Sequence, residues 1–244
     1  MHPLDLYEAC CQQPRVMAEA LAKLHGGNPR VLHEDFCGSA AVSREWCAGG
    51  GRRAVATDLH APTLAFAEQR AGTRAIRFVR GSVLENPEAV PDADVVFAGN
   101  FSVGELGARA DLLLYLTRGR QRLVDGGVLV CDVFGAPPTS EKASTRRVVP
   151  LGDGRSVEYV WEQRCWRPWS GRVCCAVHFR VLRDGEVLES LPDAFEYSWR
   201  VWSVPELIDL MAEAGLRGCA AVDPVTGGEP TVDARAVCVV GRRA

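Results

Sequence analysis

The sequence lacks the features that mark several classes of protein. No stretch approaches the 18 or more apolar residues of a membrane-spanning helix, and the N-terminus "MHPLDLYEACCQQPR" lacks the basic start and apolar core of a secretion signal. No basic run is long enough to track phosphates, and 28 Lys and Arg stand against 31 Asp and Glu. We therefore expect a cytoplasmic protein with no membrane partner and no nucleic-acid partner.

Metal and disulfide spacings are also missing, although the chain has ten cysteines. They are scattered, with adjacent pairs at Cys10-Cys11 and Cys174-Cys175, and no Cys-x-x-Cys or Cys/His cluster occurs. A chain of 244 residues that is 47% hydrophobic can bury a large core without such links. We predict reduced, mostly buried thiols and no metal site.

Apolar and amphipathic runs alternate along the first half of the chain. The apolar runs are "RVLHE", "AVATDL", "AIRFVR", "ADVVFAGN" and "GGVLVCDVF". Helical stretches are expected at 39–47, at 62–71, briefly near Pro87, and in a longer helix whose apolar face is Leu106, Ala110, Leu113 and Leu114. This alternation predicts an α/β fold with a doubly wound, mostly parallel sheet.

The C-terminal part continues this pattern. Ser203 and Glu206 form a capping-box sequence, which predicts the start of a helix. The apolar face of that helix comprises Leu207, Leu210, Met211 and Ala214. Strands near 216–221 and 236–240 bring the predicted sheet to seven strands.

Between 155 and 202 the apolar period changes from that of helices to two. Alternating runs occupy 157–161, 174–181 and 195–201, and Asp184-Gly185 is a typical hairpin turn. We therefore predict an antiparallel insertion of about three strands.

The turn "CGSA" after the first strand lies where a doubly wound sheet binds its ligand. Asp58 ends the next strand, twenty residues after Gly38, and its carboxylate can accept from both hydroxyls of a ribose. Glu34 and Asp35 lie where a ligand ammonium would meet a carboxylate, or an amide network that a carboxylate organises. The turn has one glycine instead of the dinucleotide pattern G-x-G-x-x-G, so S-adenosylmethionine suits it better than a dinucleotide.

Here the sequence resembles the class I S-adenosylmethionine-dependent methyltransferases over essentially the whole chain. "LHEDFCGSA" looks like a variant first motif of the EDFCG type, "TDLH" matches the second motif, and "GNFS" matches the motif of the fourth strand. "DGGVLVCDVFG" and "WRVWSVPEL" extend the similarity. One departure is Ser82, where the third motif often carries Asp.

The resemblance implies S-adenosylmethionine as cofactor and a seven-stranded Rossmann-like methyltransferase fold. By position, it implies a methionine site at Glu34, Cys37, Gly38 and Ser39, a ribose site at Asp58 and Leu59, adenine contacts at Ser82 and Val83, and a sulfonium site at Asn100, Phe101 and Ser102. Phe36 is a further predicted cofactor contact. It also implies three parts: an N-terminal helical lid (1–28), a methyltransferase core (29–142 and 203–244), and a β insertion (143–202) as substrate cap or dimer surface.

Candidates for acceptor binding come from the lid and the insertion. They are Tyr7, Gln12, Arg15, Trp161, Trp199 and Arg200. Five of the six tryptophans lie in or beside the insertion, where they either form a substrate wall or pack the small sheet. If the acceptor needs a general base, the candidates are His178, Tyr159 and Asp132.

We therefore expect a methyltransferase that acts on a small molecule. One alternative is a peptide or protein methyltransferase, which would need an open groove. Another is a nicotinamide-dependent oxidoreductase or a non-catalytic nucleotide-binding module, against which the missing glycines argue. A homodimer is compatible with the insertion.

Overall fold

The computed structural model describes residues 1–85, 92–135, 142–232 and 234–244, which belong to two compact units. Gln13–Ala136 and Trp202–Ala244 form the α/β unit, and Met1–Gln12 with Pro137–Val201 form the antiparallel unit.

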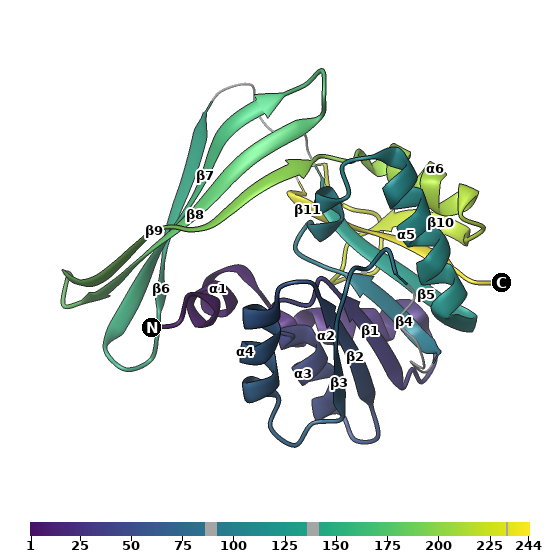
Figure 1. Ribbon diagram of the computed structural model, residues 1–244, viewed down its shortest axis with the longest axis horizontal. Coiled ribbons are helices and arrows are strands. Elements are labelled where there is room, and N and C mark those ends of the chain that lie inside the picture. Colours follow the sequence, from purple (N-terminus) through teal and green to yellow (C-terminus); the bar gives the residue numbers. More distant parts are fainter. Residues whose placement is uncertain (86–91, 136–141, 233) are drawn as a thin grey trace. The chain divides into compact units, whose positions relative to one another are not determined.

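The α/β unit contains a seven-stranded sheet in the order β10-β11-β5-β4-β1-β2-β3 (Figure 1). Its strands are β1 (Val31–Asp35), β2 (Arg53–Asp58), β3 (Ile76–Arg80), β4 (Ala93–Ala98), β5 (Leu123–Phe134), β10 (Arg217–Val222) and β11 (Ala236–Arg242). The first five strands pair in parallel, whereas β11 runs antiparallel to both β5 and β10. The predicted seven-stranded, mostly parallel sheet is confirmed.

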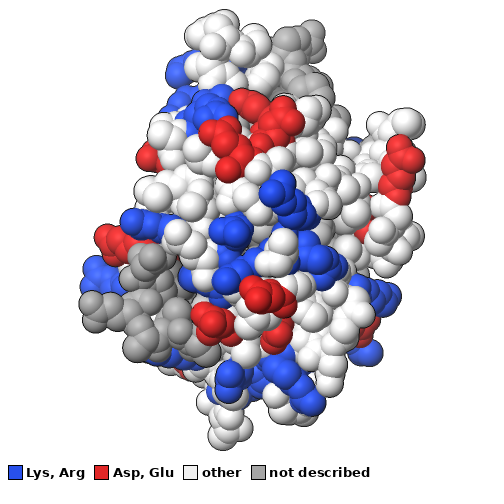
Figure 2. All heavy atoms as spheres, turned by 90° about the vertical axis from the view of Figure 1, so that its right-hand side faces the viewer, with Lys and Arg blue, Asp and Glu red and all other residues white. Residues whose placement is uncertain are grey.

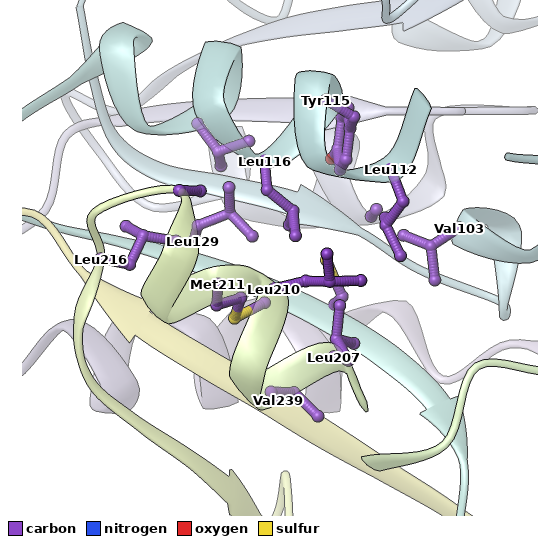
Figure 3. Close-up of a cluster of buried hydrophobic side chains, with 14 of the residues drawn as sticks. Val103, Leu112, Tyr115, Leu116, Leu129, Leu207, Leu210, Met211, Leu216 and Val239 are labelled. Carbon is purple, nitrogen blue, oxygen red and sulfur yellow. The ribbon is translucent and has the colours of Figure 1, made fainter. Parts of the chain in front are cut away.

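Helices cover both faces of this sheet. They are α2 (Pro14–His25), α3 (Ala41–Ala48), α4 (Ala61–Ala71), the 3₁₀ helix η1 (Ser102–Glu105), α5 (Arg109–Arg122) and α6 (Val204–Glu213). On one face, Leu21 of α2 and Trp46 of α3 pack on Leu32 and Val95. On the other, α5 and α6 pack on alternate residues of β4 and β5, such as Leu129 (Figure 3).

The capping box predicted for α6 is present, since the Ser203 hydroxyl accepts from the Glu206 amide and the Glu206 carboxylate accepts from the Ser203 amide. Leu207, Leu210 and Met211 are buried against the sheet, as predicted (Figure 3).

The apolar face predicted for α5 is wrong. The helix begins only at Arg109, and its buried residues are Leu112, Tyr115, Leu116 and Gly119, whereas Leu114 is 40% exposed. A side chain at Gly119 would collide with Leu129, so this glycine lets the helix lie close to β5.

The antiparallel unit contains a four-stranded sheet in the order β6-β7-β8-β9 (Figure 1). Its strands are β6 (Ala143–Pro150), β7 (Arg155–Arg167), β8 (Arg172–Arg183) and β9 (Glu186–Arg200). Asp184 and Gly185 join β8 to β9 with φ of 52° and 85°, as the predicted hairpin requires. The prediction of three strands missed β6, because most of its residues are exposed and it therefore carries no apolar alternation.

The helix α1 (Pro3–Cys11) packs on this sheet through Leu6 and Cys10, which contact Val157 and Phe179. α2 belongs instead to the α/β unit. Residues 1–28 therefore do not form one segment, because the apolar faces of the two helices are buried in different units.

Two further differences concern local predictions. Cys165 and Cys174 form a disulfide between directly opposed residues of β7 and β8, so these two cysteines are not reduced thiols as predicted, while the other eight are free. The short helix predicted near Pro87 lies outside the described residues.

No described helix is long and apolar enough to cross a membrane.

Candidate functional site

Glu34 is the next-to-last residue of β1; it faces α3 and is buried. Its carboxylate accepts from the Ser43 amide at 2.7 Å and from the Ser43 hydroxyl, in the first turn of that helix. Burial raises the pKa of Glu34 to about 7, although these hydrogen bonds oppose the shift. Glu34 therefore fixes the helix that follows the turn, which is the indirect arrangement predicted for a carboxylate that organises amides.

The turn from Phe36 to Ala40 has an unusual backbone. Phe36, Gly38 and Ala40 all have φ between 52° and 54°, in the left-handed region. The Cys37 amide donates to the Thr57 carbonyl at 2.9 Å, which ties the turn to β2. A Cβ atom on Gly38 would meet nothing within 4 Å, so open space lies above this glycine. The turn can therefore admit a ligand close to its backbone.

Asp58 joins the end of β2 to the same turn. One carboxylate oxygen accepts from the Gly38 amide at 2.9 Å, and the other accepts from the His60 amide at 2.9 Å. Each oxygen keeps a further lone pair, so the carboxylate can still accept from ribose hydroxyls. Leu59, also predicted at the ribose, is 69% exposed.

Ser82 and Val83 line a small pocket on the face of the sheet beside β3. The lining residues are Asp35, Thr57, Val79, Arg80, Gly81, Ser82, Val83, Glu85 and Arg122. The Ser82 hydroxyl accepts from the Leu84 amide at 3.2 Å, so it shapes the local turn. Asp35, which the sequence also predicted near the ligand, lines the same pocket.

The end of β4 also has a left-handed backbone. Asn100 and Phe101 have φ of 54° and 60°, which costs roughly 1–2 kcal/mol per residue. The Asp132 carboxylate, at the end of β5, accepts from the Asn100 amide at 2.8 Å and from the Phe101 amide at 2.7 Å. Ser102 follows and begins η1.

The Phe101 ring stacks on Phe134, with centroids 4.2 Å apart and planes 17° from parallel. Phe134 ends β5, and sequence reasoning missed it. The signal that could have found it was its place two residues after Asp132, on the same side of the strand.

Asp35, the last residue of β1, forms a buried ion pair. It points to the face opposite Glu34, where Arg122 donates to both of its carboxylate oxygens and the Tyr115 hydroxyl donates at 3.0 Å. Its side chain is fully buried, so the ion pair has replaced water as its partner. A direct contact of Asp35 with a ligand ammonium stays a prediction.

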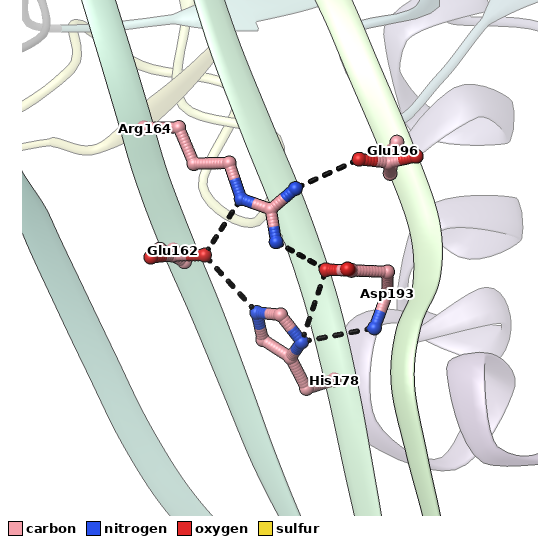
Figure 4. A network of polar contacts seen from close by, with 5 residues as sticks. All are labelled: Glu162, Arg164, His178, Asp193 and Glu196. Atoms are coloured by element: carbon pink, nitrogen blue, oxygen red, sulfur yellow. Dashed lines mark hydrogen bonds and ion pairs between the residues drawn. The ribbon is translucent and has the colours of Figure 1, made fainter.

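The other candidate bases lie in the antiparallel unit. His178 is half-buried within a network of Glu162, Arg164, Asp193 and Glu196 (Figure 4). The Asp193 amide donates to His178 Nδ1 at 3.0 Å, so Nε2 carries the proton of the neutral ring and faces Glu162 at 3.3 Å. A His178 in this state has no free lone pair to take a proton.

Tyr159 contacts Arg147, whose guanidinium carbon lies 4.7 Å from the ring centroid. Burial and the neighbouring Cys11 thiol raise the pKa of Tyr159 above its ordinary value. Its phenol is therefore a poor base at neutral pH.

The predicted acceptor residues are divided between the units. Tyr7 meets Phe195 edge-on at 5.1 Å, and Trp199 stacks on Tyr197 at 4.2 Å and is 4% exposed, so both pack the small sheet. Trp161, Arg200 and Gln12 are half-buried in the same unit. Arg15 belongs to the α/β unit and pairs with Glu19 on the surface at 3.1 Å.

No protein-family model matches the sequence, and no curated protein sequence matches it. Solved structures do match. An S-adenosylmethionine-dependent methyltransferase from Clostridium acetobutylicum has a TM-score of 0.77 at 16% identity, over 99% of this chain and 97% of that one.

Two further structures match over similar lengths. The sugar N-methyltransferase KedS8 from Streptoalloteichus has a TM-score of 0.73 at 19% identity, over 98% of this chain and 92% of that one. The amino pentose methyltransferase CalS10 from Micromonospora echinaspora, solved with S-adenosylmethionine bound, has a TM-score of 0.73 at 17% identity, over 98% and 95%. The chain therefore has the fold of the class I S-adenosylmethionine-dependent methyltransferases.

Proposed function

We propose that this protein transfers a methyl group from S-adenosylmethionine to an amine nitrogen of a small molecule, with amino sugars as the acceptor class. The observation that carries the cofactor assignment is the contact between Asp58 and the Gly38 amide, beside open space at the turn. KedS8 and CalS10, which share the fold, support a sugar amine as acceptor.

The residues present suit this cofactor. Asp58 would hold the ribose, and the turn that Glu34 fixes would hold the methionine moiety through its amides, as the resemblance implies. Asn100, Phe101 and Ser102 would lie at the sulfonium, Ser82 and Val83 at the adenine. When bound, S-adenosylmethionine supplies a methyl group on a good leaving group, so the protein has mainly to align the acceptor and exclude water.

An amine acceptor agrees with the state of the candidate bases. The Asp132 carboxylate holds the Asn100 and Phe101 amides, and His178 Nδ1 accepts a hydrogen bond from the Asp193 amide. A neutral amine attacks with its own lone pair, so it needs positioning and no strong base, whereas a hydroxyl would need one.

The alternatives have less support. In nicotinamide-binding sheets of order 3-2-1-4-5-6 all strands are parallel, whereas here β11 pairs with β5 in the antiparallel direction. A peptide acceptor remains the second candidate among methyltransferases. On the face seen in Figure 2, basic and acidic side chains lie next to one another, and the net charge is −3, which favours neither nucleic acid nor a strongly charged polymer.

Several finer expectations stay predictions. They include the cytoplasmic location, a homodimer through the antiparallel sheet, and acceptor binding by Tyr7, Gln12, Arg15, Trp161, Trp199 and Arg200. The role of the N-terminal helices as a lid also stays a prediction.

The proposal is tested by incubating the protein with S-adenosylmethionine and a panel of amino sugars, with the matching hydroxy sugars as controls. We expect a product heavier by one methyl group from an amino sugar and none from its hydroxy counterpart. Methylation of hydroxy sugars alone would contradict the amine assignment, and methylation of peptides alone would favour the second candidate.

A further inference from the structure

We infer that Asp132 is a positioning residue for methyl transfer, which holds the backbone of Asn100 and Phe101 in its left-handed conformation through both carboxylate oxygens. This inference rests on the proposed function. It replaces the role of general base that the sequence suggested for Asp132.

The geometry assigns one carboxylate oxygen to each amide. Oδ2 accepts from Asn100 at 2.8 Å and Oδ1 accepts from Phe101 at 2.7 Å. Two further hydrogen bonds of this turn run from the Ser102 amide to the Gly99 carbonyl at 3.1 Å and from the Gly104 amide to the Phe101 carbonyl at 2.9 Å. Asp132 is therefore the partner that holds the two left-handed amides themselves.

This contact requires the ionised carboxylate. A carboxylate accepts on both oxygens, whereas a carboxylic acid or a carboxamide turns a hydrogen-bearing group toward one of the two amides. Protonation of Asp132, or its replacement by Asn, would therefore break one hydrogen bond and bring two donors face to face.

The backbone angle of Phe101 also sets the direction of its ring. The ring stacks on Phe134 with centroids 4.2 Å apart, and Phe134 lies on the same strand as Asp132. Release of the Phe101 amide would let the ring leave Phe134 and would move Asn100 with it. The residues proposed at the sulfonium would then lose their alignment.

The charge of Asp132 changes in an accessible pH range. Burial raises the pKa of Asp132 to about 6, although the two amide bonds oppose the shift. The titratable neighbours are Cys131 on the same strand and Cys238 opposite on β11, and burial raises the pKa values of both thiols, so they stay neutral there. The carboxyl group is half ionised at about pH 6, so the contact forms increasingly above this pH and is progressively lost below it.

The test compares wild type, Asp132→Asn and Asp132→Glu with the control Asp125→Asn, an exposed aspartate of the same strand. Turnover with S-adenosylmethionine and a methylated acceptor is measured from pH 5 to pH 8, together with cofactor affinity by calorimetry. We expect kcat of Asp132→Asn to fall about 100-fold at pH 7.5, with a much smaller change in affinity, because misalignment of reacting groups acts on the chemical step.

The pH profile separates positioning from a general loss of structure. The kcat of wild type should decline below about pH 6, whereas that of Asp132→Asn should not. Both proteins contain the Glu34 carboxyl group, whose pKa is about 7, so a decline caused by Glu34 would occur in both. Asp132→Glu should keep the decline. Asp125→Asn should behave as wild type.

An Asp132→Asn variant with wild-type kcat and a wild-type pH profile would overturn the inference. If circular dichroism shows that Asp132→Asn is unfolded, the test relies on Asp132→Glu. A pH profile of kcat for Asp132→Glu without a decline at acidic pH would then overturn the inference. Wild-type protein that transfers no methyl group to any acceptor would contradict the proposed function instead.

Discussion

Glu34 and Asp35 are neighbours in the sequence, yet their side chains lie on opposite faces of the sheet and have different partners. Successive residues of a strand point to opposite faces of a sheet, so Glu34 meets α3 and Asp35 meets α5. Glu34 fixes a helix through its amide and hydroxyl donors, whereas Asp35 is neutralised by Arg122. One strand end thereby connects both helical layers to the edge where the candidate site lies.

Replacing Arg122 with Leu should destabilise the protein by about 3–5 kcal/mol, because it leaves the Asp35 charge buried without its partner. The free energy of unfolding in urea measures this loss. Arg118→Leu on the same helix is the control and should change it by less than about 0.5 kcal/mol. An Arg122→Leu loss as small as that of the control would show that the pair does not stabilise the fold.

At this scale the sequence predicted contacts that depend on strand ends. The sequence assigns Gly38 to the ligand because it follows a buried strand and Asp58 because it ends one, and a hydrogen bond joins the two residues in the structure. The contacts of Asp132 could not be predicted, because its amide partners lie 31 and 32 residues away and depend on the pairing of Ala98 with Cys131.

At the scale of elements, α6 is the helix whose start, apolar face and end follow most directly from its sequence. Its capping box satisfies amides that the helix cannot pair internally. Gly215, with φ of 88°, follows the last turn.

Ser203→Ala should therefore lower the free energy of unfolding by about 1 kcal/mol, the usual effect of losing an N-cap side chain. Chemical denaturation provides the measurement. Thr73→Ala, in the exposed turn after α4, is the matched control and should have little effect. Equal effects of the two substitutions would contradict a stabilising cap.

The elements that the sequence did not predict have weak or ambiguous patterns. β6 is exposed along most of its length, so no alternation identifies it. The segment of α5 contains the run "LLLYL", which can supply more than one apolar face, and the choice depends on the close approach of Gly119 to Leu129. Periodicity specifies a face only where polar residues interrupt the apolar ones.

At the scale of the whole molecule, two carboxyl groups with raised pKa values lie at the carboxyl edge of the seven-stranded sheet. Burial raises the pKa of Glu34 to about 7 and that of Asp132 to about 6. Each contributes stability that is fully present below its unfolded pKa and is lost as the pH rises through its folded pKa. Global stability should therefore decline between about pH 4.5 and pH 7 on account of these groups.

Glu34→Gln should reduce that decline, because the amide oxygen still accepts from Ser43 but carries no charge to bury. The slope that Glu34 adds is at most about 1.4 kcal/mol per pH unit. Urea unfolding of both proteins from pH 4.5 to pH 8 measures it. Parallel pH curves for the two proteins would mean that Glu34 has an ordinary pKa.

Sequence patterns and the resemblance together predicted the architecture of the chain, because a parallel sheet with flanking helices leaves a strong alternation of elements. The particular acceptor is not encoded in such patterns. Spacing along the chain does not specify which side chains contact an acceptor.

Calorimetric titration of the protein with S-adenosylmethionine, for wild type and Asp58→Ala, tests the central claim most directly. We predict saturable one-site binding to wild type and an affinity for the variant that is lower by about 1–3 kcal/mol, or roughly 5- to 150-fold. Absence of binding to wild type, or equal affinity for the two proteins, would contradict the claim that the ends of β1 and β2 hold this cofactor.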